Sequence, residues 1–198
     1  MTKDKNKQIY KLSITALMAA LCYAAFTFLK IPIPTPAGYT ALHLGNAFCV
    51  LAALLMGGVY GGLAGSLGMT IADLMDPVYI SSAPKTFVLK LCIGLITGYI
   101  AHRIAHIRRK EHKKAYVLKW SLISAAAGLG FNVIMDPIVG YLFKRYFLGV
   151  HADAAKIMAA WAAGASLVNA FAGVILSVSV YAALRPILEK SGLAEYLS

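Results

Sequence analysis

The sequence predicts an all-α integral membrane protein with six transmembrane helices and both termini in the cytoplasm. Three observations lead to this fold class. The chain of 198 residues is 60% hydrophobic, whereas soluble domains average about 45–50% apolar residues. Its apolar residues gather into six spans, and its basic residues gather on one side of them. We therefore expect a single six-helix membrane domain over residues 1–198.

The six spans are separated by polar or proline-rich connections. The expected boundaries are 9–29, 43–56, 59–74, 86–107, 118–147 and 154–184. The second and third spans are shorter than the ~20 residues that cross a bilayer as a helix, so we expect them to be tilted or covered by neighbours. The lysine-rich start resembles a signal peptide, but no small-residue cleavage site follows it, which favours a retained first helix.

Lysine and arginine are distributed unevenly over the connections. If the spans alternate from a cytoplasmic N-terminus, 13 of the 19 basic residues lie in inner segments and five in outer segments, with Lys90 inside a span. The block 103–119 contributes most of this bias. Positive residues favour the cytoplasmic side, so the net charge of +11 indicates topology rather than nucleic-acid binding.

Prolines shape two of the outer connections. Pro32, Pro34 and Pro36 alternate in the first, which predicts a stiff, extended segment that either caps a pocket or simply joins two helices. In the second, Ser81 or Ser82 is expected to cap the fourth helix, with Pro84 in its first turn.

Polar side chains inside the apolar spans indicate an internal binding site. Asp136, which precedes Pro137, costs roughly 2.5–3.5 kcal/mol at a helix centre, so it is expected to face a cavity, a partner or a substrate. Convergent polar and aromatic groups suit a small aromatic ligand that forms hydrogen bonds. The candidate ligand-binding residues are His43, Asn46, Tyr79, Lys85, Lys90, Asn132, Asp136, Trp161 and Asn169. Alternatively, Asp73 or Asp136 pairs with Lys85 or Lys90.

Small residues at four-residue spacing mark surfaces where helices approach closely. The stripe Ala16, Ala20 and Ala24 either packs internally or faces another protein, whereas the glycine stripe over 57–65 is expected to pack internally. A shared Met-Asp-Pro sequence in 74–78 and 134–138 gives only thin support for an internal repeat.

Enzyme and metal signatures are missing from the sequence. It contains no H-E-x-x-H or G-x-S-x-G motif, no convincing metal-ligand spacing among its three cysteines and five histidines, and no Walker motif. We expect no catalytic residues, no metal and no cofactor.

Three stretches resemble a known family. They read YTALHLGNAF (39–48), MGGVYGGLAGSLGMTIADLMDP (56–77) and SAPKTFVLK (82–90). They are similar to the substrate-binding S components of energy-coupling-factor (ECF) transporters, in the riboflavin-transporter-like branch. The resemblance implies a vitamin-capture protein of a bacterial cell membrane that binds its ligand under the first outer loop. It also implies docking, through Ala16, Ala20 and Ala24, on a T component that carries two cytoplasmic ATPases.

The resemblance leaves the substrate open. It implies riboflavin, or a pyridoxine-type or hydroxymethylpyrimidine-type compound, and the Asn, Asp and His residues favour a small pyridine or pyrimidine alcohol. The alternative function is a stand-alone, proton-coupled secondary transporter that uses Asp73 or Asp136. An integral-membrane enzyme or assembly factor is disfavoured because no catalytic constellation is present.

Overall fold

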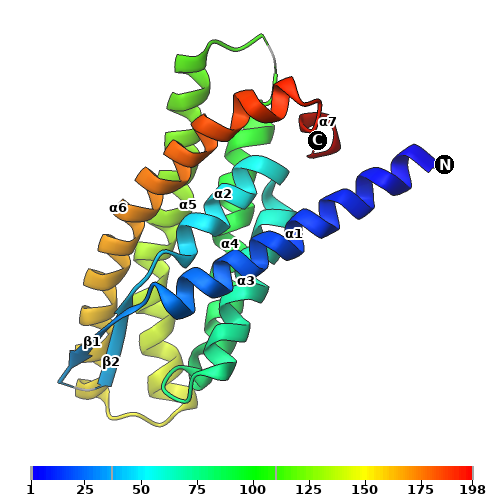
Figure 1. Cartoon of the computed structure of the whole chain (residues 1–198). Coiled ribbons are helices and arrows are strands. Elements are labelled where there is room, and N and C mark those ends of the chain that lie inside the picture. Colours follow the sequence, from blue (N-terminus) through cyan, green and yellow to red (C-terminus); the bar gives the residue numbers. More distant parts are fainter. Residues whose placement is uncertain (1, 37, 110, 198) are drawn as a thin grey trace.

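A computed structural model describes residues 2–36, 38–109 and 111–197, which form a bundle of helices with one β-hairpin at its end (Figure 1). The α-helices are α1 (Thr2–Phe28), α2 (Gly45–Met56), α3 (Gly58–Met75), α4 (Ala83–Tyr99), α5 (Lys114–Leu142), α6 (Ala152–Lys190) and α7 (Ala194–Leu197). The hairpin consists of β1 (Ile31–Thr35) and β2 (Gly38–Leu42). A 3-10 turn, Ile80–Ser82, precedes α4, and the π-helical segments Ile100–Ile104 and Phe143–Phe147 extend α4 and α5.

Four helical segments are long and apolar enough to cross a membrane. They are Lys5–Phe28, Ile80–Ile104, Lys114–Phe147 and Ala152–Lys190. By contrast, α2 has 12 residues, nearly all of them buried by neighbouring helices. At 1.5 Å per residue it is about 18 Å long, well short of the ~30 Å hydrocarbon core. The structure therefore shows α2 as short and covered by its neighbours, while the span boundaries and the membrane crossing of α2 and α3 remain predictions.

Glycines allow α3 to pack closely against two helices. A Cβ on Gly61 would lie 2.3 Å from the Cα of Ala53 in α2, and one on Gly98 in α4 would lie 2.0 Å from the backbone nitrogen of Gly58. Gly57 joins α2 to α3 with a φ of +93°, a value that side chains rarely permit. The predicted internal packing of the glycine stripe is confirmed.

The proline-rich connection forms an antiparallel hairpin that the sequence did not predict. Residue Ile31 pairs with Leu42, and Thr35 pairs with Gly38. Pro32 and Pro34 lie at alternate positions of β1, so their missing N–H groups fall on one side of the strand, and an edge strand tolerates this. The expected extended conformation is confirmed for 31–35, whereas residue 37 lies outside the described residues.

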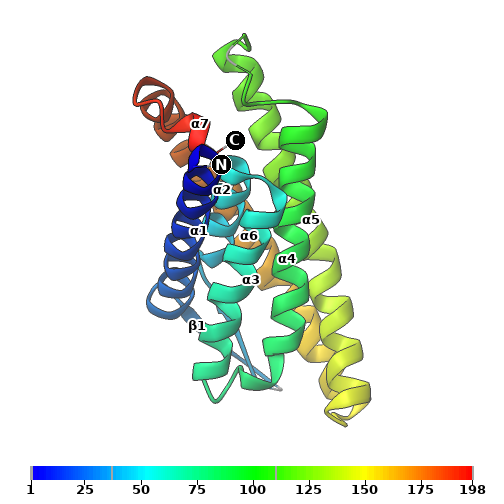
Figure 2. The same cartoon turned by 90° about the vertical axis from the view of Figure 1, so that its right-hand side faces the viewer.

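The hairpin marks one end of the bundle, and α7 lies toward the other end, beside the N-terminal half of α1 (Figures 1 and 2). Tyr10 of α1 and Tyr196 of α7 are in contact, with ring centroids 5.5 Å apart. Pro84 lies in the first turn of α4 as predicted, but the expected cap at Ser82 makes no side-chain hydrogen bond to the helix. We call the end that carries β1 and β2 the hairpin end.

Candidate ligand-binding site

A polar cavity lies at the hairpin end of the bundle. Its volume is about 110 Å³, several times the roughly 10–15 Å³ that one water molecule needs. Strand β2, the segment that leads into α2, and the adjoining parts of α3 to α6 form its walls. Eight of the nine predicted ligand-binding residues line it: His43, Asn46, Tyr79, Lys85, Lys90, Asn132, Asp136 and Asn169.

Asp136 on α5 joins three helices at the cavity wall. Lys85 Nζ on α4 donates to Asp136 Oδ1 at 2.7 Å, and the Ser166 hydroxyl on α6 donates to Oδ2 at 2.7 Å. Helix α5 continues through Pro137 instead of breaking there. The structure therefore pairs Asp136 with Lys85, which was one of the two alternatives that the sequence left open.

Lys90 and Asn132 form a more buried part of the cavity wall. Lys90 Nζ donates to Asn132 Oδ1 at 3.2 Å, and the two residues are only 7% and 2% exposed. The Cys49 thiol donates to the Lys90 carbonyl at 3.6 Å and so links this part of α4 to α2. An ammonium group is thus fixed among apolar helices with an amide oxygen as its hydrogen-bond acceptor.

The remaining buried polar groups differ in whether they have hydrogen-bond partners. The Thr86 hydroxyl donates to Asp73 Oδ2 at 2.5 Å. Among the described residues, His43 Nδ1 and Asn46 Oδ1 have no hydrogen-bond partner although both atoms are buried. A buried polar atom without a partner is costly. These two residues therefore offer hydrogen-bonding capacity to a molecule in the cavity.

Asn169 on α6 holds the hairpin in place. Its Oδ1 accepts the His43 N–H at 2.9 Å, and its Nδ2 donates to the Ala41 carbonyl at 3.0 Å. The oxygen and the nitrogen of the amide thus both form hydrogen bonds with the chain at the end of β2. The geometry gives Asn169 a positioning role at the cavity roof.

A second set of contacts lies beside the cavity, between the residues that follow α1 and the segment that joins α3 to α4. Lys30 Nζ lies 2.5 Å from Asp76 Oδ2 and 4.6 Å from the centroid of the Tyr79 ring, and the Tyr79 hydroxyl donates to the Thr40 carbonyl at 3.4 Å. The hydrogen bond from Lys30 holds the pKa of Asp76 below its usual value. Burial, with the Asp76 charge adding to it, raises the pKa of Tyr79 to about 12. Tyr79 is therefore a neutral hydrogen-bond donor at physiological pH.

Comparison with protein families identifies the chain. Residues 6–186 match the family model described as "ECF-type riboflavin transporter, S component". The chain belongs to this family. The resemblance read from residues 39–90 is thereby confirmed over most of the sequence.

Two further comparisons place this S component among known proteins. The solved structure of ThiT from Listeria monocytogenes has the same fold, with a TM-score of 0.64 and 17% identity, over 93% of this chain and 97% of that one. An uncharacterized protein of Pyrococcus woesei is 39% identical over 72 residues, which make up 36% of this chain. The match spans 46% of that relative's length.

Trp161 lies outside the cavity of this S component. It lines an apolar notch between the hairpin and α6, together with Ile33 and Leu42, and is 45% exposed. The α6 residues that reach the cavity include Met158, Ala162, Ser166 and Asn169, which follow a helical stripe of four- and three-residue steps. Position 161 is one residue from that stripe, about 100° around the helix, so its side chain faces away.

The sequence analysis missed several residues of the cavity wall. Ser166 precedes Asn169 by three residues on α6, so helical spacing alone places the two on the same face. Lys144 lies near the end of α5 and was counted only as a topology signal. Thr86 and Phe26 carried no signal, because isolated threonines and phenylalanines are common in apolar helices.

The alanine stripe on α1 faces away from the bundle. Ala16 and Ala20 are exposed and Ala24 is half-buried, whereas Met18 and Cys22 face the core. Most of this stripe is therefore not packed against other helices of the chain. It is available to a partner.

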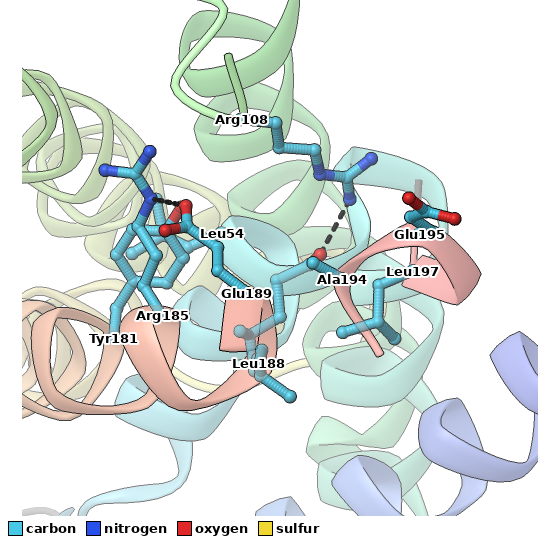
Figure 3. A pocket seen from close by; sticks show the side chains of 10 residues that line it. Leu54, Arg108, Tyr181, Arg185, Leu188, Glu189, Ala194, Glu195 and Leu197 are labelled. Atoms are coloured by element: carbon cyan, nitrogen blue, oxygen red, sulfur yellow. Dashed lines mark hydrogen bonds and ion pairs between the residues drawn. The ribbon is translucent and has the colours of Figure 1, made fainter. Parts of the chain in front are cut away.

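A second cavity lies at the end opposite the hairpin (Figure 3). Arg108 donates to the Leu55 carbonyl at 2.7 Å, and Arg185 pairs with Glu189 at 2.8 Å. The rest of its lining is mainly apolar, from α2, α6 and α7. Arg108 satisfies a carbonyl at the end of α2 that has no partner within the helix. These arginines have structural contacts, so the cavity at the hairpin end is the better candidate site.

Proposed function

We propose that this protein is the vitamin-binding subunit of an ATP-driven ECF uptake transporter. Its membership of the S-component family and the polar cavity at the hairpin end support this function. The single observation that carries the proposal is the position of Lys90, Asn132, Asn46 and His43. They are grouped around one cavity inside an apolar bundle, beneath a hairpin that roofs it. Polar groups of this kind are expensive in a membrane protein unless they serve a ligand or one another.

The proposed topology places six transmembrane helices in a cell membrane, with both termini in the cytoplasm and the hairpin end outside. The basic block 103–119, near the end opposite the hairpin, supports this orientation. A bacterial cell membrane remains the predicted location. The ligand would then reach the cavity from outside, past Lys30, Asp76 and Tyr79.

The proposed ligand is a small heteroaromatic vitamin or vitamin precursor. Riboflavin is the compound that the family description names, and pyridoxine-type and hydroxymethylpyrimidine-type compounds are the alternatives. Ring edges that contain both donors and acceptors suit Asn46, Lys90 and Asn132. Of the nine predicted ligand-binding residues, we retain eight as proposed contacts or positioning residues and leave out Trp161.

The proposed partners are a T component and two ATPase subunits. Ala16, Ala20 and Ala24 support a docking surface on α1, because their small side chains let another helix backbone approach closely. ATP hydrolysis would then take place in the partners. Replacing Ala20 with Leu should abolish uptake but leave ligand binding by the isolated subunit unchanged.

The decisive experiment identifies small molecules that co-purify with the protein in detergent, by mass spectrometry. Wild type should carry a heteroaromatic vitamin, and Asn132→Ala should lose it, whereas Trp161→Ala should retain it. Uptake into proteoliposomes should require the T component, the ATPases and ATP. Uptake driven by a pH gradient in liposomes that contain this chain alone would instead establish the secondary transporter.

A further inference from the structure

The charges that line the cavity do not balance. Its charged side chains are three lysines and two aspartates: Lys85, Lys90, Lys144, Asp73 and Asp136. Asp136 is bound by Lys85 and Ser166, and Asp73 is bound by Thr86. Among the described residues, no carboxylate oxygen lies within 4.0 Å of Nζ of Lys90 or Lys144. With His43 neutral, the wall carries an excess of one positive charge.

Of the two lysines without a carboxylate partner, Lys90 is the more deeply buried, so its charge has the greater need of a compensating group. It is 7% exposed, and its Nζ makes one hydrogen bond, to the neutral amide oxygen of Asn132. An ammonium group has three N–H donors, so two remain for a molecule in the cavity. A buried charge needs an opposite charge or several hydrogen bonds to offset the loss of water. The described side chains around Lys90 supply one hydrogen bond and no paired anion.

The contacts on the outer side of Tyr79 show the opposite arrangement. There Lys30 already has a carboxylate partner in Asp76. Lys144, in the π-helical segment that follows α5, is half-buried and also lines the cavity. The positive charge without a carboxylate partner therefore belongs to residues that line the cavity, whereas Lys30, which does not line it, is paired.

We infer that the ligand of this cavity is an anion: a heteroaromatic compound carrying a carboxylate or phosphate whose acidic group binds Lys90, with Lys144 adding to the positive potential. This inference rests on the proposed function, a heteroaromatic vitamin as ligand, but replaces the compounds named there, because riboflavin and the pyridine or pyrimidine alcohols are neutral. In the complex, the acidic group accepts the free N–H donors of Lys90. Asn46 Oδ1, which has no partner, accepts a donor on the ring.

Matched pairs of ligands test the charge directly. Binding to the detergent-solubilised protein is measured by isothermal titration calorimetry for nicotinate and nicotinamide, 4-pyridoxate and pyridoxine, and flavin mononucleotide and riboflavin. In at least one pair the acid should bind ten-fold or more tightly than its neutral partner. The first two pairs report a carboxylate and the third reports a phosphate.

Substitution of Lys90 assigns the effect to one residue. Lys90→Met should weaken binding of the preferred acid by about 30-fold or more, as expected for removing one member of a buried charge pair. Its effect on the neutral partner should be less than about three-fold. Lys90→Arg keeps the charge and should keep the preference for the acid, which also guards against a Met variant that fails to fold. Lys156→Met removes an exposed lysine beside Asp153 and should change nothing.

The outcomes separate this inference from the function on which it rests. Equal or tighter binding of the neutral member in every pair that binds overturns the inference and leaves the vitamin-binding function standing. A Lys90→Met variant that weakens acid and neutral ligand equally also overturns it, because Lys90 would then act only on the shape of the cavity. If none of the six compounds binds, the charge of the co-purifying molecule tests the inference: an anion supports it, and a neutral molecule overturns it. A protein that carries no such molecule contradicts the proposed function itself.

Discussion

The ion pair between Lys85 and Asp136 should behave as a coupled unit when either partner is removed. Asp136→Asn leaves the ammonium group of Lys85 without its carboxylate, and Lys85→Met leaves the carboxylate with Ser166 alone. Each single substitution should therefore destabilise the protein strongly. The double variant Lys85→Met, Asp136→Asn removes both charges together and should recover most of the loss.

The magnitude follows from the burial of the pair. The two side chains are 14% and 17% exposed. Removing one member of a fully buried pair costs about 3–5 kcal/mol. The residual exposure, and the hydrogen bond that Ser166 retains, reduce this to about 2–3 kcal/mol. For a chain of this size, 1 kcal/mol shifts Tm by about 2–4 °C, so each single variant should unfold about 4–12 °C lower.

Thermal unfolding in one detergent, followed by tryptophan fluorescence, completes the double-mutant cycle. The loss of Tm in the double variant should be no more than about half of the sum of the two single losses. The exposed pair Lys156 and Asp153, 3.6 Å apart, is the matched control, and breaking it should move Tm by less than about 2 °C. Additive shifts at Lys85 and Asp136, or shifts as small as those of the control, would refute the reasoning.

Three further predictions concern the pair between Lys30 and Asp76, the helix packing and the outer notch. Asp76→Asn removes a partly exposed pair with Lys30 worth about 0.5–1 kcal/mol, so bound ligand should dissociate about two- to five-fold faster in stopped-flow measurements. Because the pKa of Asp76 is depressed in the fold, the contribution of the pair is complete above the unfolded value of about 3.9 and is lost only as pH falls below it. The ratio of the two rates should therefore be constant from pH 6 to 8, and a ratio that collapses in this range would exclude the ion pair as its cause. Gly61→Ala forces a Cβ into the backbone of α2 and should lower stability by about 1–3 kcal/mol in thermal unfolding. Gly130→Ala, where a Cβ meets nothing within 4 Å, should not destabilise, and equal losses at both sites would argue against close packing as the cause. Trp161→Ala should leave the ligand Kd within about two-fold, and a ten-fold loss would place this side chain in the binding site.

Helical spacing explains why the candidate site was largely predictable. Asn132 and Asp136 are four residues apart, so they share one face of α5 wherever that helix lies. A polar face in an apolar helix must turn away from lipid, and in a small bundle such faces converge. Trp161 does not line the cavity, whereas the other eight candidates do, and the difference lies in residue type. An aromatic side chain is tolerated whether it faces lipid or a cavity, so the residue type does not indicate the direction in which it points.

Contacts between distant segments could not be predicted in this way. The hairpin was read as an extended connector because nothing in 30–42 shows which segment pairs with β1. Asn169 was expected at the ligand, but its amide is engaged by β2 and His43. These contacts depend on how α6 is rotated and how deeply it packs, and one helix's own sequence does not specify either.

Residue composition and spacing were enough to predict the apolar spans, the bias of basic residues, the close packing of the glycine stripe and the polar character of an internal site. These properties follow from local composition and from the 3.6-residue period of the helix. The packing of the helices, by contrast, pairs Asp136 with Lys85 and leaves Lys90 without a carboxylate partner among the described residues. The choice between two lysines five residues apart on α4 depends on how α4 and α5 lie against each other, because they face different sides of their helix. That relative rotation determines which charge remains for a ligand.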